Sequence, residues 1–548
     1  MEDLAHQPTV PALIRHLADK YGDRVMAKYG DQTLTFRQAE RQSAELALAL
    51  LASGVGKASR LGVLMPNSLE WIISWLAAVR IGALVAGVST FLKPRELAWL
   101  VRFGDFQTLL VRDTYLRRDY VRELEEALPS LAAQGGAKPL VLAEAPYLRS
   151  VWTWGDQRPA WARGSGADLL QLGRGAPGLD EAFLEAVEAQ VSPADLGVVI
   201  FTSGTTADPK GVVHSHGTVV RRAYDLLPFG PSAVGETVGV MTPLFWIGGL
   251  LTNVLNTMIA GGTLVIPERP DAGYMVEFLK REKLDYLNGW AGQFNAIRQH
   301  PDFDPQLFAD LKPTGGTQGR AGIVGPPSDV SPLRIPSLMG MTESFGPHTG
   351  EAPGTVVSEE LSGSHGRTIG GIEQKIIDPD TGEELPAGQI GELLIRGPLL
   401  MQGYYKRERF EVFEPDGFFR TGDRCHLSKD GHLFFHGRTG EMIKTSGANV
   451  APQEVERVLM SFADVQEAYV MGRPDASIGE MVVAVVVPKA GANPGEAELR
   501  ARLDKELSSY KVPKRIAFAA SADLPRSASE KIQKHKLLEM FDFTQTAA

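Results

Sequence analysis

The sequence predicts an α/β protein: a large N-terminal domain of stacked mixed sheets with helices plus a small barrel, and a small α+β C-terminal domain. The first observation is length, because 548 residues exceed what one hydrophobic core usually serves. The second is that apolar segments typical of strands alternate with segments of helical period, which favours partly parallel sheets. The third is a change to short strands and turns from Gly363, and a new pattern after Arg438.

The composition is that of an ordinary water-soluble globular protein, with 43% hydrophobic and 22% charged residues. The net charge of −10 argues against a nucleic-acid partner, because such proteins are usually basic. The single cysteine, Cys425, excludes an intramolecular disulfide and a cysteine-cluster metal site. The opening MEDLAHQPTV lacks the basic and apolar segments of a signal peptide, so we expect a cytoplasmic protein.

The first third of the chain shows the clearest alternation of helices and strands. Helices are expected at residues 10–21, 36–53 and 68–81, and strands at 26–30, 33–35, 60–65 and 83–88. Trp71–Thr90 is the most membrane-like stretch, but it contains Arg80 and predicts a buried helix followed by a strand rather than an integral membrane segment. Residues 132–178 lack periodicity, which predicts an irregular surface segment with a short strand at Pro139–Leu142.

The rest of the chain continues the alternation of helices and strands and then changes to short strands separated by turns. Strands are expected at residues 196–201, 235–244, 262–266 and 286–288, with helices at 247–260 and 274–282. Short strands at 369–377, 391–396 and 431–436, separated by turns, predict a small antiparallel barrel. The last segment has helices at 452–460 and 496–509 and strands at 465–471 and 481–487. We therefore expect an N-terminal domain over residues 1–437, a hinge at 438–441 and a C-terminal domain over 442–548, whose size is typical of a separate domain.

The segment Phe201–Gly211, FTSGTTADPKG, combines two glycines, four hydroxyl side chains and a lysine behind an apolar strand. Glycines let the backbone approach a ligand, and N–H groups and hydroxyls bind phosphate oxygens, so the segment predicts a phosphate cradle. A polar turn between two elements is the alternative. The order Lys210-Gly211 excludes the P-loop of nucleoside triphosphatases, which needs Gly-Lys-Ser/Thr.

The same string resembles the phosphate-binding signature of the adenylate-forming superfamily: acyl- and aryl-CoA synthetases, luciferase and peptide-synthetase adenylation domains. The resemblance implies that the loop holds the phosphates of ATP. The loop residues concerned are Thr202, Ser203, Gly204, Thr205, Thr206 and Lys210. Six further segments resemble motifs of the superfamily, and together with this loop they span the chain from Phe201 to Lys531.

Two of these segments concern the acid and the metal. TPLFWIG at Thr242–Gly248 resembles the segment that gates the acyl pocket, with Trp246 in the gating place; a core tryptophan is the alternative. LMGMTES at 338–344 resembles the Y-G-x-T-E motif. By that match Thr342 binds the α-phosphate and Glu343 holds Mg²⁺, a hard cation that prefers oxygen ligands. In the same segment Met339 replaces the aromatic residue that stacks on adenine, and Gly340 lines the acid site.

Two further segments concern the nucleotide. PTGGTQG at 313–319 resembles the loop that touches adenine and the acyl chain, which implies a role for Gly316. FRTGD at 419–423 resembles the motif whose aspartate binds both ribose hydroxyls, here Asp423. A plain turn is the alternative for Asp423, and nearby Cys425 is expected to be a packing residue rather than a nucleophile.

The last motifs concern the C-terminal domain. HGRTGEMIKTSGA at 436–448 places Arg438 as a ribose- or phosphate-binding residue and Gly440 as the hinge, where glycine suits a large backbone swing. By the same resemblance, Lys444 and Gly447 lie on a loop that moves in for the second half-reaction. PRSASEKIQKHK at 525–536 resembles the motif of the catalytic lysine, which implies Lys531. Here Glu530 replaces the usual glycine, and Lys534 and Lys536 are alternatives.

The resemblance implies an ATP-dependent ligase of carboxylic acids and coenzyme A, with Mg²⁺ as cofactor and a mobile C-terminal domain. The catalytic residues implied are Lys531, Thr342, Glu343 and Lys210. The large residues Trp246 and Trp290 favour a bulky apolar or aromatic acid. An amide-forming ligase or carrier-protein loader, and a non-catalytic nucleotide- or acyl-binding homologue, are the alternative functions. The sequence does not fix the oligomeric state, and a homodimer is compatible with it.

Overall fold

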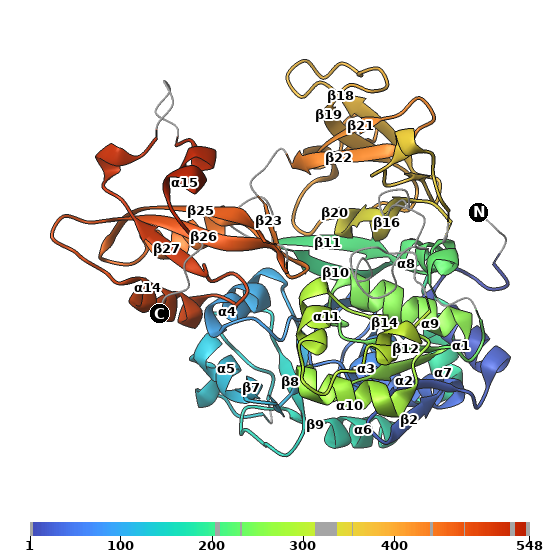
Figure 1. The fold of residues 1–548 in the computed structure, drawn as a ribbon. Coiled ribbons are helices and arrows are strands. Elements are labelled where there is room, and N and C mark those ends of the chain that lie inside the picture. The colour runs from blue at the N-terminus through green and yellow to red at the C-terminus, as the bar shows by residue number, and fades with distance from the viewer. Residues whose placement is uncertain are drawn as a thin grey trace. The chain divides into compact units, whose positions relative to one another are not determined.

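A computed structural model of the chain describes residues 4–136, 138–202, 209–230, 233–312, 337–352, 355–438, 442–475, 477–525 and 532–543 (Figure 1). The chain divides into two compact units. Unit 1 collects Met1–Thr90, Leu100–Ile200 and Gly211–Gly437, and unit 2 collects Phe91–Trp99, Phe201–Lys210 and Arg438–Ala548. The architecture is mixed α/β with a large N-terminal and a smaller C-terminal part, so the predicted fold class is confirmed.

The largest sheet has eight strands in the order β20-β11-β10-β4-β3-β5-β8-β9 (Figure 1). Its strands are β3 (Arg60–Leu64), β4 (Leu84–Gly87), β5 (Thr108–Arg112), β8 (Ser150–Trp154), β9 (Gly164–Ser165), β10 (Leu196–Thr202), β11 (Lys210–Ser215) and β20 (Gly403–Tyr404). The strands β10, β4, β3, β5, β8 and β9 pair in parallel, whereas β20 runs antiparallel to β11. The sheet is therefore mixed, as predicted.

A second mixed sheet has five strands in the order β14-β12-β13-β1-β2. These are β1 (Val25–Tyr29), β2 (Gln32–Thr35), β12 (Thr237–Val240), β13 (Thr263–Ile266) and β14 (Tyr286–Asn288). Only β2 is antiparallel, and it follows β1 through a tight turn at Gly30, whose φ is +55°. This positive φ suits glycine, which explains why the hairpin turns there.

The prediction for residues 132–178 is wrong. The stretch Pro139–Leu142 is not a strand; the strand is β8, Ser150–Trp154, which pairs in parallel with β5 in the large sheet. The segment continues through β9 into helix α6 (Gly166–Arg174). Its Gly, Pro and Trp content hid the pattern, because Val151 and Trp152 are both buried and give no alternation of apolar and polar residues.

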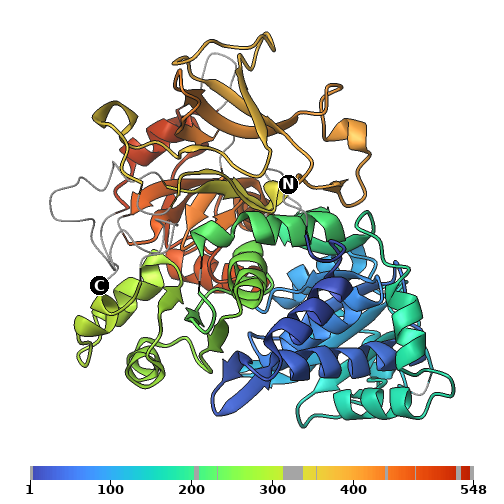
Figure 2. The same cartoon turned by 90° about the vertical axis from the view of Figure 1, so that its right-hand side faces the viewer.

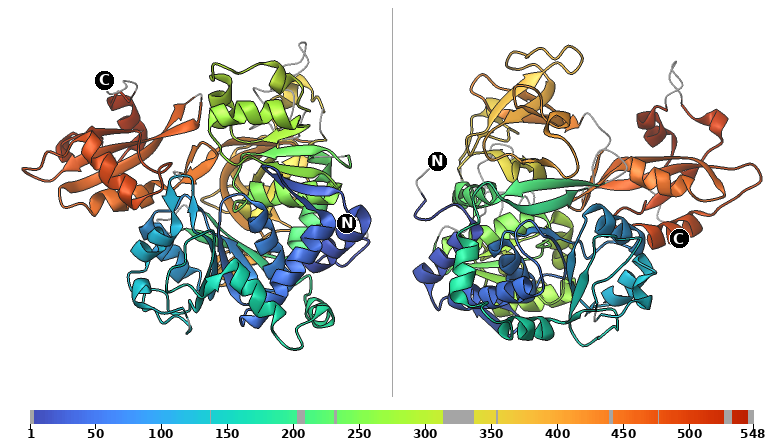
Figure 3. Two further views of the ribbon diagram at one scale, coloured as in Figure 1. Left: turned by 90° about the horizontal axis from the view of Figure 1, so that it is seen from below. Right: turned by 180° about the vertical axis from the view of Figure 1, so that it is seen from behind.

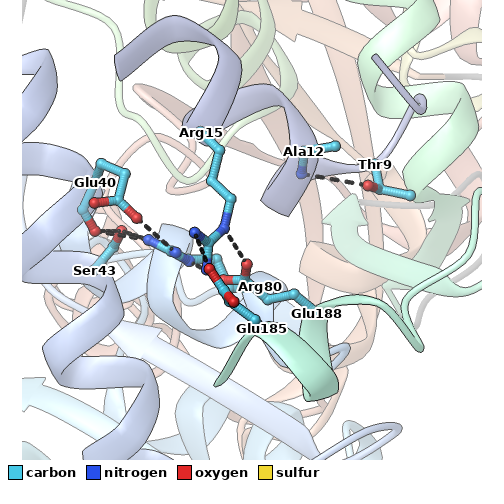
Figure 4. Close-up of polar contacts among 8 residues, drawn as sticks. All are labelled: Thr9, Ala12, Arg15, Glu40, Ser43, Arg80, Glu185 and Glu188. Carbon is cyan, nitrogen blue, oxygen red and sulfur yellow. Dashed lines mark hydrogen bonds and ion pairs between the residues drawn. The ribbon is translucent and has the colours of Figure 1, made fainter. Parts of the chain in front are cut away.

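Helices α1 (Val10–Tyr21) and α2 (Phe36–Ala52) lie side by side, in dark blue in Figure 2. They join α3 (Leu69–Arg80) and α7 (Glu181–Glu188) around the fully buried side chain of Arg80 (Figure 4). Arg80 donates to the carboxylates of Glu188 and Glu40, and Arg15 Nε donates to the other oxygen of Glu188 at 2.6 Å. Each buried charge is therefore paired, which a low-dielectric interior requires.

Helix α3 followed by β4 confirms the buried helix and strand predicted for Trp71–Thr90. Within the described ranges, the structure contains no helix whose length and apolarity would suffice to cross a membrane. The other helices of the N-terminal part are α4 (Pro94–Phe103), α5 (Tyr120–Ala127), α8 (His216–Asp225), α9 (Asn256–Ala260), α10 (Ala272–Glu282), α11 (Ala291–Arg298) and α12 (Gln306–Ala309).

The helix predicted for residues 247–260 is a π-helix over Gly248–Leu255, which continues as α9. Smaller antiparallel sheets follow. One has the order β15-β16-β17 and the other β18-β19-β21-β22. Their strands are β15 (Met339–Met341), β16 (Gly346–Gly350), β17 (Arg367–Thr368), β18 (Glu373–Ile377), β19 (Gly391–Arg396), β21 (Phe419–Leu427) and β22 (Leu433–Arg438).

The C-terminal part is built on a sheet in the order β24-β23-β26-β25, with β27 parallel to β26. Strands β25 (Val465–Asp475) and β26 (Gly479–Pro488) pair along almost their whole length, in orange in Figure 3. The other elements are β23 (Ile443–Thr445), β24 (Ala448–Val450), β27 (Arg515–Phe518), α13 (Pro452–Met460), α14 (Glu496–Glu506) and α15 (Lys534–Met540). Leu499 and Leu503 of α14 are fully buried, as the helical spacing predicted.

Candidate active site

The Thr-Glu motif forms a single 3₁₀ turn, Thr342–Ser344, between strands β15 and β16. The chain leaves this turn through Phe345, which has φ +47° and is fully buried, and Gly346, which has φ +104°. Strand β16 then returns so close to β15 that a Cβ on Gly340 would lie 2.4 Å from the carbonyl oxygen of Gly346. Only glycine fits at position 340, so the chain reverses tightly and presents Thr342 and Glu343 at the bend.

Three consecutive carbonyl oxygens of this turn each accept a hydrogen bond from a different element. His214 of β11 reaches the carbonyl of Thr342 with Nε2 at 2.8 Å. The N–H of Met401, just before β20, donates to the carbonyl of Glu343 at 2.8 Å. Arg222 of α8 donates from Nε to the carbonyl of Ser344 at 3.3 Å. Because these donors come from three elements, the backbone of the turn is fixed in one place.

Burial sets the protonation state of His214. The side chain is fully buried, and desolvation lowers its pKa to about 3 although the bond to the Thr342 carbonyl opposes this shift. The ring is therefore neutral at physiological pH. A carbonyl only accepts, so the proton of the neutral ring is on Nε2. The ring centroids of His214 and Phe345 also lie 4.7 Å apart, with the rings edge to face. This contact fixes the orientation of the His214 ring.

The carboxylate of Glu343 is half-buried and accepts a hydrogen bond from the hydroxyl of Tyr404 at 2.8 Å on Oε1. Among the residues that the structure describes, no group of three or more His, Cys, Asp or Glu side chains could hold a metal ion by itself. A single carboxylate fits Mg²⁺ nonetheless, because this ion is usually held by one or two carboxylates together with substrate phosphates and water. Glu343 is therefore a suitable ligand for Mg²⁺.

The structure places part of the predicted nucleotide site. Met339 and Gly340 lie on β15 directly before the turn, and Met339 packs against a buried cluster that also contacts Tyr404. Thr202 ends β10 and Lys210 begins β11, so both lie where the phosphate motif predicted them, and both are half-buried. The predicted loop residues between them, Ser203, Gly204, Thr205 and Thr206, lie outside the described residues.

Asp423 lies on β21 with its side chain almost fully buried. Its N–H donates to the hydroxyl of Thr421 at 3.0 Å, and that hydroxyl donates to the carbonyl of Leu393 on β19 at 2.8 Å. The same strand β21 carries Phe419, whose ring lies 6.3 Å from the ring of Tyr404, edge to face. The backbone that carries Asp423 is thus fixed by hydrogen bonds to the neighbouring strand.

The remaining predicted residues are distributed over several places. Arg438 ends β22. Lys444 is exposed on β23, and its N–H donates to Glu480 at 2.7 Å. Gly447 has φ +80° in the turn between β23 and β24, where glycine is favoured. The predicted residues Gly316, Gly440 and Lys531 lie outside the described residues.

The predicted acid-binding segment is lined by aromatic rings. Trp246 and Trp290 are both half-buried, and their ring centroids lie 5.3 Å apart; Phe245 lies 5.4 Å from Trp246. Leu251 of the π-helix packs where the chain leaves the Thr342–Ser344 turn, because a Cβ added to Gly346 would come 2.5 Å from the Cδ2 atom of Leu251. Trp246, predicted from its motif, therefore lies in a wall that also reaches the turn of Thr342.

Sequence reasoning missed a chain of polar side chains behind this wall. Asn253 of the π-helix is fully buried and donates from Nδ2 to the hydroxyl of Thr242 at 2.7 Å. Asn288 of β14 donates to Asn253 Oδ1 at 2.6 Å. The signal in the sequence was a polar residue within an apolar helix, and such a residue needs a buried partner. His214, Arg222 and Tyr404 were also missed, because their partners lie far away in the sequence.

The motifs and the mixed α/β fold agree with the adenylate-forming superfamily, which the sequence resembles. The chain belongs to this superfamily: the AMP-binding enzyme family matches residues 14–405, and the AMP-binding enzyme C-terminal domain matches residues 454–531. The resemblance stated from the motifs is therefore confirmed.

Individual relatives agree with this assignment. The mitochondrial medium-chain acyl-CoA ligase of Rattus norvegicus is 30% identical over 93% of this chain and 83% of its own. Two solved structures share the fold. The o-succinylbenzoate CoA synthetase of Bacillus subtilis has a TM-score of 0.71 at 23% identity and covers 96% of this chain and 98% of that one. The amide bond synthetase McbA of Marinactinospora thermotolerans has a TM-score of 0.73 at 24% identity. The match covers 96% of this chain and 99% of McbA.

Proposed function

We propose that this protein is an ATP-dependent carboxylic acid:CoA ligase, which forms an acyl-adenylate with release of pyrophosphate and then an acyl-CoA thioester. The observation that carries the proposal is the braced turn, in which Thr342 and Glu343 are held by donors on three consecutive carbonyl oxygens. Such a fixed hydroxyl and carboxylate suit phosphoryl chemistry, which depends mainly on alignment and electrostatic stabilisation.

In the first half-reaction, a carboxylate oxygen of the acid attacks the α-phosphorus of ATP, and the bond from that phosphorus to the pyrophosphate oxygen breaks. We assign Thr342 to the α-phosphate and Glu343 to Mg²⁺, which when bound would neutralise negative charge between the phosphates. Asp423 would accept hydrogen bonds from the ribose hydroxyls. The loop that ends at Lys210, together with Lys531, would supply further donors to the phosphates.

In the second half-reaction, the sulfur of coenzyme A attacks the carbonyl carbon of the acyl-adenylate, its proton is lost, and AMP leaves. The acyl-adenylate is a reactive mixed anhydride, so water must be excluded from it until the thiol arrives. We propose that Arg438, Gly440, Lys444 and Gly447 serve this second step, with the hinge at residues 438–441 between domains 1–437 and 442–548. The cytoplasmic location stays a prediction, and so does a homodimer.

We further propose a bulky apolar or aromatic acid as substrate. The support is the contact between Trp246 and Trp290, because each indole offers a large apolar surface and the two ring centroids lie 5.3 Å apart. The curated relative supports a ligase of organic acids with CoA, since it is named as a medium-chain acyl-CoA ligase. Gly316 and Gly340 complete the proposed acid site.

A specific observation also favours a second acceptor. The amide bond synthetase McbA shares this fold at a TM-score of 0.73, so an amine could replace the thiol as the group that takes the acyl moiety. The first half-reaction would be the same in both cases. The two functions therefore differ only in the product that follows the acyl-adenylate.

The test is to incubate the protein with ATP, Mg²⁺ and a panel of acids, with and without CoA, and to measure AMP and acyl products by mass spectrometry. Acyl-CoA formed faster from aromatic or long-chain acids than from acetate is the expected result. Acid-dependent AMP without a thioester would favour the amine acceptor instead. AMP that does not depend on any acid would contradict the proposed function.

Lys531→Ala sharpens this test because it separates the two half-reactions. If Lys531 stabilises the charge that develops at the α-phosphate, the variant should form adenylate slower by orders of magnitude. Transfer of the acyl group from a preformed adenylate to CoA should remain near the wild-type rate. Lys534→Ala is the matched control at the neighbouring alternative lysine, and an equal loss in both half-reactions would contradict the role of Lys531.

A further inference from the structure

The carboxylate of Glu343 is held by a tyrosine from a distant part of the chain. Tyr404 donates its hydroxyl hydrogen to Glu343 Oε1 at 2.8 Å. The ring of Tyr404 is half-buried, lies 6.3 Å from the ring of Phe419 and packs against the cluster that contains Val212. Because the ring is packed on these neighbours, its hydroxyl has a defined position relative to Glu343.

The segment that carries Tyr404 also holds the main chain of Glu343. The N–H of Met401 donates to the carbonyl oxygen of Glu343 at 2.8 Å. The segment is itself fixed to β11 by two main-chain hydrogen bonds. The N–H of Gln402 donates to the carbonyl oxygen of Val213 at 2.8 Å, and the N–H of Tyr405 donates to that of Gly211 at 2.7 Å. The main chain and the carboxylate of Glu343 are thus both held by a segment that is itself bonded to β11.

A tyrosine suits this position chemically. The phenol is neutral at physiological pH, so it fixes one carboxylate oxygen without cancelling the negative charge, as a lysine or arginine would. The carboxylate thus keeps the full negative charge that a hard cation requires. Partners of this kind, which hold a ligand but do not touch the metal, typically change metal affinity or activity by about 10–100-fold when removed.

We propose that Tyr404 is a positioning residue that sets the Glu343 carboxylate for Mg²⁺ and couples it to strand β11. The inference rests on the proposed function, in which Glu343 holds the metal that accompanies ATP. Tyr404 contacts neither substrate nor metal in this scheme. Its effect should therefore appear in every step that depends on Mg²⁺ and be absent from steps that do not.

The test is Tyr404→Phe, which keeps the ring and removes only the hydroxyl. The adjacent Tyr405→Phe is the matched control, because Tyr405 donates to Asp105 at 2.9 Å rather than to Glu343. The primary readout is calorimetric titration with the non-hydrolysable analogue α,β-methylene-ATP, with and without Mg²⁺. The second readout is the Mg²⁺ concentration that gives half-maximal adenylation, together with the melting temperature of each variant.

For Tyr404→Phe we expect the tightening of analogue binding by Mg²⁺ to fall by about 10-fold or more. Binding without Mg²⁺, the melting temperature and acyl transfer from preformed adenylate should stay near wild-type values, and Tyr405→Phe should match the wild type throughout. A Mg²⁺ response of Tyr404→Phe equal to that of the wild type would overturn this inference alone. The absence of any Mg²⁺ response in the wild type would overturn the proposed role of Glu343 as well.

Discussion

The Thr-Glu turn, Thr342–Ser344, and the aromatic wall proposed for the acid, formed by residues 242–255 and 286–293, are held by different sets of contacts. In the turn, donors from β11, α8 and the segment before β20 bind main-chain carbonyl oxygens. In the wall, Asn67 binds the main chain at Thr242 and Leu244, and side chains also hold one another, through the rings of Trp246 and Trp290 and, behind them, the amides of Asn253 and Asn288.

This difference suggests how one fold serves many acids. Bonds to the main chain do not depend on the side chain of the residue that accepts them, so the turn keeps its shape while other positions change. A wall made of side-chain contacts changes its shape with each substitution. We therefore expect the chemistry and the choice of acid to be separable in this protein, and the following predictions test that separation.

The largest effect is expected from Glu343→Gln. This variant keeps the size of the side chain and the backbone bonds of the turn but removes the charge that would hold Mg²⁺. Adenylation should slow by about 10²–10³-fold, similar to the loss of one electrostatic contact in a transition state. Acid-dependent release of pyrophosphate measures it.

The control for Glu343→Gln is Glu360→Gln, which changes an exposed carboxylate later in the chain. It should keep the wild-type rate. The relative rates among acids should also be unchanged in Glu343→Gln, because the wall is intact. A change in acid preference, or a rate within two-fold of the wild type, would contradict the separation of the two regions.

A second effect is expected on acidification, and it concerns the surroundings of the turn. His214 on β11 and His348 on β16 are fully buried, and burial lowers the pKa of each to about 3. The unfolded chain binds these protons near pH 6.5 and the folded chain does not, so the folded state loses stability as the pH falls from 6.5 toward 3. The wall carries no histidine between residues 242 and 293.

Each buried histidine should contribute a slope of at most about 1.4 kcal/mol of unfolding free energy per pH unit. Denaturant unfolding between pH 7 and 4 measures the slope at constant ionic strength. His348→Leu should reduce it, whereas His535→Gln, at an exposed position, should leave it unchanged. An unchanged slope in His348→Leu would show that this ring is protonated in the folded protein.

The smallest effect on rate, and the largest on selectivity, is expected from Trp246→Ala. Removing the indole opens space beside Trp290, so larger acids should gain relative to the preferred one. The ratio of their kcat/KM values should shift by about 10-fold, the scale of one or two contacts in an apolar pocket. Adenylation of a panel of acids of increasing length measures the shift.

Trp154→Ala is the control for this prediction, because Trp154 is also half-buried but lies on β8, outside the wall. It should leave the order of acids unchanged. An equal loss for every acid in Trp246→Ala would instead show that Trp246 is a packing residue, the alternative that the sequence left open.

The sequence predicted the parts of the fold that follow from local pattern. The strands β10, β13 and β19 and the buried helix α3 all appear where periodicity placed them. The strand β8 was missed because both of its faces are buried and its neighbours are irregular. The π-helix Gly248–Leu255 was predicted as an ordinary helix, since the two differ in hydrogen bonding and not in composition.

The same distinction applies to the site. Thr342 and Glu343 were predicted because they form a short motif, and the structure places them on one turn. Tyr404, His214 and Arg222 were not predicted, because each acts on that turn from another part of the chain and leaves no local signature. The roles of Ser203, Gly316 and Lys531 stay predictions, and they depend on the experiments proposed above.

The pairing of β20 with β11 has a consequence for the order of events during synthesis. Val212 pairs with Tyr404, and Glu343 lies between them in the chain, so the turn is made before Met401 and Tyr404, the residues that bind Glu343. At about 5–20 residues per second, roughly ten to forty seconds pass between synthesis of β11 and of β20. During that interval the edge of the large sheet is unpaired at β11, and a nascent chain that stops before residue 401 carries Thr342 and Glu343 with the donors His214 and Arg222 but without Met401 and Tyr404.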